Sequence, residues 1–238
     1  MTRIVRVIST TVSLYLVTHL FVFTVLPFAI LISYLDRERI PSIKKWFVKC
    51  IFAIVGMRLK VSGHDNYNPE CRYVIVSNYP SGYAGFALIG EFPQASLVAH
   101  AFLSRIPLIS QALKMIGAVF VQPGLAGRGR KAIDIYLGEH DDVPSAIILP
   151  EGRIAKDGKI HRFRRGFVHI QRQTCFDVLP VTLNGLFQLK PFGRLYADPD
   201  AKPEMVIHPA IRASVAGQMS DEELIAFVKE TVESTYRP

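Results

Sequence analysis

The 238-residue sequence predicts an α/β fold with a mostly parallel or mixed central sheet flanked by helices, behind an N-terminal helical membrane anchor. Two observations predict this architecture. Short runs of β-branched and aliphatic residues alternate with helical stretches along most of the chain, which is typical of a sheet covered by helices. Residues 12–35 contain no charged residue and exceed the ~20 residues that cross a bilayer core. We therefore expect a membrane-embedded segment at 1–41 and an α/β domain at 42–238.

The predicted N-terminal segment differs from a signal peptide, because its apolar run is too long and no small-x-small cleavage site follows. Pro27 is expected to kink or divide the helix, so a full span and a hairpin in one leaflet both remain open. Residues 42–56 predict a second, basic amphipathic helix, which lies either in the head-group plane or packed on the domain.

The net charge of +8 favours anionic partners. Beside a membrane segment, anionic lipid is the simpler partner, and no nucleic-acid-binding motif is present. The three cysteines are far apart and form no C-x-x-C pair, which argues against a disulfide framework or a zinc site. We therefore expect membrane phospholipids as partners, no nucleic acid and no metal.

The strand and helix candidates follow one another along the chain without a long Gly/Ser or Pro linker. The strand candidates are 58–61, 73–76, 96–99, 118–121, 145–149 and 178–182. The helix candidates are 83–90, 108–116, 128–137, 164–174 and 221–235. Ser220, followed three residues later by Glu223, predicts a capping box at the start of the last helix.

Four short blocks carry a recognisable pattern: 76–84 (VSNYPSGYA), 117–123 (GAVFVQP), 149–154 (LPEGRI) and 178–182 (VLPVT). In this order and approximate spacing they resemble the 1-acylglycerol-3-phosphate (glycerophospholipid) acyltransferase family, which has N-H-x-x-x-x-D, G-x-x-F-I-x-R, F-P-E-G-T-R and V-x-P-V. The resemblance spans roughly residues 48–185. It implies the family's α/β fold and transfer of an acyl chain from a thioester to a hydroxyl of a lysophospholipid or similar lipid. It also implies acyl-CoA or an acyl-carrier-protein thioester as cosubstrate, without a tightly bound cofactor.

The first block departs from the family at its catalytic pair. The family's histidine is the general base for the acceptor hydroxyl, and its aspartate orients the imidazole; here Tyr79 and Ala84 stand at those positions. A tyrosine with a pKa of about 10 is ionised only about one part in a thousand at pH 7. Three alternatives remain for the base: His100, which follows a predicted strand, an activated Tyr79, or the substrate itself. The candidate catalytic residues are Tyr79, His100 and Glu151.

The second block departs at the family's phosphate-binding arginine, where this chain has Pro123. The basic residues at 128–131 follow at once, and with a helix N-terminus they are able to hold an anion, although a solvated basic turn is the competing interpretation. In the third block, Gly152 suits a tight turn, and Arg153 lies one residue from the family's arginine. The candidate substrate-binding residues are Asn78, Arg128, Arg130, Lys131, Gly152 and Arg153.

Two functions are compatible with this pattern. The first is a divergent, membrane-associated acyltransferase that uses a non-standard base. The second is a catalytically inactive pseudoenzyme that serves as a lipid-binding or assembly subunit at the membrane. In either case we expect the α/β domain on the cytoplasmic side, with an acyl-carrier protein or a membrane protein as candidate partners.

Overall fold

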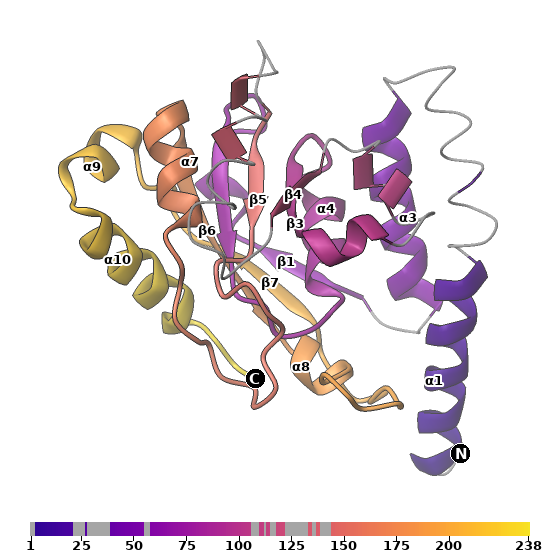
Figure 1. The fold of residues 1–238 in the computed structure, drawn as a ribbon. Coiled ribbons are helices and arrows are strands. Elements are labelled where there is room, and N and C mark those ends of the chain that lie inside the picture. Colours follow the sequence, from indigo (N-terminus) through magenta and orange to yellow (C-terminus); the bar gives the residue numbers. More distant parts are fainter. Residues whose placement is uncertain are drawn as a thin grey trace.

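Seven strands of the computed structural model form one sheet with helices on both of its faces (Figure 1). The structure describes residues 3–20, 27, 39–54, 58–105, 110–111, 113–114, 118–121, 133–134, 137–138 and 144–238. The strands are β1 (Lys60–Ser62), β2 (Tyr73–Ser77), β3 (Ser96–His100), β4 (Val119–Val121), β5 (Ala146–Ile148), β6 (Asp177–Asn184) and β7 (Glu204–Ile207).

The strand order is β1-β7-β6-β2-β5-β3-β4. Strands β6, β2, β5, β3 and β4 are parallel to one another, whereas β7 is antiparallel to β6 and β1 is parallel to β7. The carboxyl ends of five parallel strands therefore meet at one edge of the sheet. The predicted α/β class with a mixed sheet is confirmed, and each of the six predicted strands corresponds to an observed one.

The helices divide between the two faces of the sheet. They are α1 (Arg3–Leu20), α3 (Ile40–Ile54), α4 (Ala84–Glu91), α7 (Gly166–Thr174), α8 (Leu186–Leu189), α9 (Ala213–Gln218) and α10 (Asp221–Ser234), with 3-10 turns η3 (His64–Asn66) and η4 (Ala101–Arg105). Figure 1 shows α7, α9 and α10 on one side of the sheet and α1, α3 and α4 on the other. The predicted helices at 108–116 and 128–137 lie largely outside the described residues.

Strand β2 is at the centre of this arrangement because both of its faces are covered. All five of its residues are buried. Ile75 packs into one core with Leu88 of α4, while Val74 and Val76 pack into the other with Phe167 of α7. Burial on both faces explains why the sequence here is a continuous aliphatic run instead of an alternating one.

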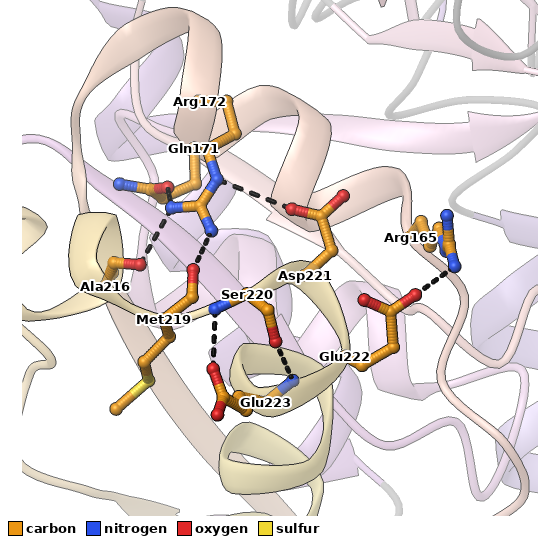
Figure 2. A network of polar contacts seen from close by, with 9 residues as sticks. All are labelled: Arg165, Gln171, Arg172, Ala216, Met219, Ser220, Asp221, Glu222 and Glu223. Atoms are coloured by element: carbon orange, nitrogen blue, oxygen red, sulfur yellow. Dashed lines mark hydrogen bonds and ion pairs between the residues drawn. The ribbon is translucent and has the colours of Figure 1, made fainter.

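A polar network joins α7 to the start of α10, as Figure 2 shows. Arg172 donates to the carbonyl oxygens of Ala216 and Met219, each at 2.7 Å. The predicted capping box is present, since Ser220 N donates to Glu223 Oε2 at 2.7 Å and Glu223 N donates to Ser220 Oγ at 3.2 Å. These contacts fix the C-terminal helix against α7.

The predicted membrane anchor gains no support from the structure. Within the described part of the chain, no helix combines the length and the hydropathy that a membrane crossing requires. Helix α1 begins at Arg3 and includes only the first part of the predicted span at 12–35; residues 21–26 and 28–35 lie outside the description. Instead, α1 contacts the α/β domain, since Thr11 Oγ1 accepts from Ala197 N at 2.9 Å. The boundary at residue 41 stays a prediction.

Candidate functional site

The loops that follow β2 and β5 meet at the carboxyl edge of the sheet. Val76 and Ile148 are paired in the ladder, so both chains leave the sheet at the same level. Beyond them, Tyr79 N donates to Glu151 Oε1 at 2.7 Å, and His161 N donates to Glu151 Oε2 at 2.9 Å. Glu151 is only 3% exposed. Both oxygens of one buried carboxylate therefore hold two separate loops together.

Asn78 has a structural partner. Its Nδ2 donates to the carbonyl oxygen of Leu183 at 3.0 Å, and its Oδ1 accepts from Leu183 N at 2.8 Å. The side chain is 1% exposed. The amide group is thus engaged with β6, and the predicted contact of Asn78 with substrate gains no support from its surroundings.

Tyr79 and Ala84 occupy the positions where the first block departs from the family. The Tyr79 side chain is half-buried, and burial raises its pKa above the ordinary tyrosine value. An activated Tyr79 requires a lowered pKa, which is the opposite direction. Ala84 is the first residue of α4 and is fully buried. A methyl group at this position has no means of orienting a base.

The turn after β5 sets the position of Glu151. Gly152 N donates to Leu149 O at 3.0 Å, and Gly152 has a φ of 69°, in the left-handed region that favours glycine. The predicted tight turn is therefore present. Burial raises the pKa of Glu151, while the N–H groups of His161 and Tyr79 act in the opposite direction. Arg153, next in the chain, is exposed.

His100 is the last residue of β3, at the same edge of the sheet as Tyr79 and Glu151. Its ring is exposed, and its Nδ1 accepts from Phe102 N at 3.0 Å. Among the described residues, no hydrogen bond joins His100 to Asn78 or Glu151. Its role as a displaced base stays a prediction.

The remaining predicted site residues are not placed. Arg128, Arg130 and Lys131 lie outside the described residues. Metal-ligating side chains were not predicted, and the described ranges contain no group of three His, Cys, Asp or Glu side chains suited to hold a metal ion.

A histidine–aspartate contact that was not predicted from the sequence lies in the loop that follows Glu151. His161 Nε2 is 2.9 Å from Asp157 Oδ1. Both residues belong to the loop between Glu151 and α7, and this loop also contacts the backbone of Tyr79, because Ala155 N donates to Tyr79 O at 2.9 Å. The sequence feature that could have indicated this contact is D-x-x-x-H at 157–161. However, a spacing of four residues brings two side chains together reliably only in a helix, and these residues form a loop.

Comparisons with known proteins agree with the fold and the order of the blocks. The acyltransferase family model matches residues 58–184, more than half of the chain. The crystal structure of the 1-acyl-sn-glycerophosphate (LPA) acyltransferase PlsC from Thermotoga maritima superposes with a TM-score of 0.83 at 25% identity, covering 98% of this chain and 95% of that one.

Curated relatives carry the same family name. The 1-acyl-sn-glycerol-3-phosphate acyltransferase of Pseudomonas aeruginosa is 30% identical over 197 residues, which are 77% of this chain and 74% of that protein. The chloroplastic enzyme BAT2 of Brassica napus is 28% identical over 152 residues, 63% of this chain. The chain spans less than half of the length of BAT2, 43%.

The fold and the meeting of the two loops define an α/β protein of the acyltransferase type, as the resemblance implied. With a family match over more than half of its length and a relative at 30% identity over most of both chains, this chain belongs to the acyltransferase family.

Proposed function

We propose that this chain transfers an acyl group from an acyl thioester to a hydroxyl of a lysophospholipid or similar lipid acceptor, with a base other than the family's histidine. The observation that carries the proposal is the contact between Glu151 and the backbone of Tyr79 at 2.7 Å. This contact joins the two blocks that resemble the family's catalytic motifs, although the catalytic pair is replaced. Relatives named for 1-acyl-sn-glycerol-3-phosphate support an acceptor of this kind.

The cosubstrate of the proposed reaction is acyl-CoA or an acyl-carrier-protein thioester. Either donor places a reactive carbonyl beside a good leaving group, so the protein needs to supply only orientation, a base and stabilisation of the developing oxyanion. These needs require no resident metal or cofactor.

The proposed site of action is the membrane, with phospholipids as partners and the α/β domain on the cytoplasmic side. One face of α1 supports an association with the membrane. Four apolar residues recur on it at intervals of four and are each between 57% and 72% exposed: Ile4, Ile8, Val12 and Leu16. An exposed apolar helix face of this kind is suited to the acyl region of a bilayer. The first two turns of α1 also line a groove of about 450 Å³ together with Arg194, Tyr196 and Asp198.

A second candidate is an inactive member of the family that binds lipid or assembles with a membrane protein. The replacement of both catalytic residues favours it, together with the raised pKa of Tyr79. The two candidates differ in whether the chain turns over a thioester.

The test is an acyl-transfer assay on the full chain in detergent, with acyl-CoA and acyl-carrier-protein donors against a panel of lysophospholipids. Turnover is expected for the wild type and is expected to fall strongly in Glu151→Ala. The control Glu230→Ala changes an exposed glutamate on α10 and is expected to retain the wild-type rate. Thermal unfolding of each variant separates loss of chemistry from loss of fold.

The restored variant Tyr79→His/Ala84→Asp distinguishes the two candidates. A silent wild type with an active restored variant would mean that the substrate cleft is intact and that the chain itself is not an enzyme. Silence from both, with retained binding of phospholipid vesicles that contain lysophospholipid, would favour the lipid-binding role.

A further inference from the structure

The proposed reaction needs a group that accepts the hydroxyl proton, and histidine is the side chain best suited to this near neutral pH. A histidine with a carboxylate neighbour is the strongest form of such a base, because the carboxylate orients the ring and stabilises its protonated state. In the part of the chain that the structure describes, the histidines paired with a carboxylate are His64 with Glu91, His161 with Asp157 and His169 with Asp134.

Their places in the fold separate these three pairs. His64 follows β1, which runs opposite to β2, so it lies at the other edge of the sheet from Tyr79. His169 belongs to α7 and lies outside the loop that contacts Tyr79. Only the pair of His161 with Asp157 belongs to that loop.

The backbone of His161 is held next to that of Tyr79. The N–H groups of both residues donate to the two oxygens of the same Glu151 carboxylate, at 2.9 and 2.7 Å. Ala155 N donates to Tyr79 O at 2.9 Å, so the loop from Glu151 to His161 contacts Tyr79 through both its N–H and its carbonyl. The backbone of the loop that carries the pair is therefore held at Tyr79, the position at which the family has its histidine.

We propose that His161 is the catalytic base of this chain and that Asp157 is its positioning residue, an inference that rests on the acyl-transfer function proposed above. In the tautomer whose Nε2–H donates to Asp157 Oδ1, Nδ1 carries the lone pair, and none of the described residues makes a hydrogen bond to it. Nδ1 takes the proton of the acceptor hydroxyl while the hydroxyl oxygen bonds to the thioester carbonyl carbon. The carbon–sulfur bond then breaks, its electron pair leaves with sulfur, and the thiolate takes the proton back from Nδ1. The products are an ester and a free thiol.

The charges around the ring favour this role. The Lys159 N–H and then the His161 ring hold the pKa of Asp157 below its ordinary value, so Asp157 is ionised at neutral pH. Tyr236 donates to Gly158 O at 2.8 Å, and burial, with Glu151 and Asp157, raises its pKa to about 12, so it is neutral. The charged group in contact with the ring is thus the Asp157 carboxylate, and Glu151 accepts from the His161 N–H. Lys159 and Arg162 flank His161 in the chain, and both of their side chains are exposed, so water screens their positive charges.

The experiment compares kcat/KM of His161→Gln, Asp157→Asn, His100→Gln and the wild type in the acyl-transfer assay on the full chain. We expect His161→Gln to lose about 10²–10⁴-fold, the usual contribution of a general base. The matched control is His169→Gln, which removes another histidine–aspartate contact and is expected to retain the wild-type rate. His161→Ala is expected to recover part of the lost rate when imidazole is added to the buffer.

Asp157→Asn is expected to lower kcat and to move the acidic limb of the pH profile of kcat/KM to lower pH, because a protonated imidazole is less stable without a neighbouring negative charge. A merely structural role for Asp157 would lower the rate without moving this limb, and would overturn its assignment.

Three results would overturn the inference. The first is a His161→Gln variant that keeps the kcat/KM of the wild type. If His100→Gln loses its activity instead, the base is His100 at the end of β3, and the proposed function stands. The second is a loss of activity in His161→Gln that comes with a lowered thermal midpoint, while imidazole does not rescue His161→Ala. This combination would mean that His161 has a structural role. The third is a silent wild type beside an active Tyr79→His/Ala84→Asp variant, which would overturn the proposed catalytic function as well.

Discussion

The side-chain amide of Asn78 pairs with the backbone of Leu183 in both directions, donating to its carbonyl at 3.0 Å and accepting from its N–H at 2.8 Å. The ladder between β2 and β6 has its last pair at Ser77 and Val181. The Asn78 side chain therefore continues this pairing beyond the ladder, and it sets the direction in which the chain leaves β2 toward Tyr79. The first block of the site depends on this connection.

Asn78→Ala is expected to lower the free energy of unfolding by about 2–6 kcal/mol, because it leaves two buried backbone groups of Leu183 unpaired at about 1–3 kcal/mol each. Urea unfolding measures the change. The control is Gln173→Ala, which removes an exposed amide on α7 and is expected to change stability by less than about 0.5 kcal/mol. Equal stability of the two variants would mean that the Asn78–Leu183 pairing is not made in the folded protein.

Tyr79→Phe is expected to keep acyl-transfer turnover within about threefold of the wild type, a change below about 1 kcal/mol in the barrier. Burial raises the pKa of Tyr79, so its hydroxyl stays protonated at neutral pH and cannot serve as the base. Steady-state kinetics on the full chain measure kcat and KM. If Tyr79→Phe instead lost activity by two orders of magnitude, the tyrosine itself would act on the substrate.

The meeting of Tyr79 and Glu151 was accessible from the sequence because both residues follow strands of one parallel sheet. Parallel strands end at the same edge, so residues far apart in the sequence converge there without any knowledge of the loops. The same reasoning applies to His100, which ends β3, but it does not determine where an exposed ring points.

Loop conformation was beyond what the sequence predicts. The contact between Asp157 and His161 depends on a turn at Gly158, which has a φ of 71° and lies against the ring of Phe187 from a distant part of the chain. Side chains in such a loop do not repeat at a regular interval, so the spacing of four residues between Asp157 and His161 did not predict their contact. Strand β7 is not among the predicted strands, because Glu204–Ile207 lies between Pro203 and Pro209, which are typical of loops.

Stability is expected to fall as the pH drops below about 6.5, partly because of His208. His208 is 7% exposed, its Nε2 lies 2.8 Å from Thr182 Oγ1, and burial lowers its pKa. Since the folded-state pKa lies below the unfolded-state value, the unfolded chain binds the proton more tightly, and acid shifts the equilibrium toward it. His208→Gln is expected to reduce the slope of unfolding free energy against pH on the acidic side of neutrality. Gln188→Ala changes an exposed side chain that does not titrate and is expected to leave the slope as it is. An unchanged slope in His208→Gln would exclude His208 as its source.

Helices α3 and α4 approach each other closely at Gly90. A Cβ added there would lie 2.6 Å from Cβ and Cγ1 of Val48, a separation that real side chains do not adopt. This close packing holds α3 against α4 of the α/β domain. Because α4 begins at Ala84, in the first block of the site, α3 is connected to the site through α4. Gly85, in the same helix, has room, because an added Cβ would lie 3.7 Å from Leu97 Cδ2.

Gly90→Ala is therefore expected to destabilise the protein by about 1–3 kcal/mol through overpacking, less the gain of up to about 1 kcal/mol in helix propensity. Gly85→Ala is expected to be neutral or stabilising by about 0.4–1 kcal/mol. Adding Val48→Gly to Gly90→Ala removes the Cβ and both Cγ atoms that the new methyl group would meet. A double-mutant cycle on urea unfolding should then return a coupling energy of about 0.5–3 kcal/mol. If both glycine variants stabilise the protein equally and the cycle gives no coupling, α3 is not packed on α4 at this point, and the position of the amphipathic helix on the domain must be different.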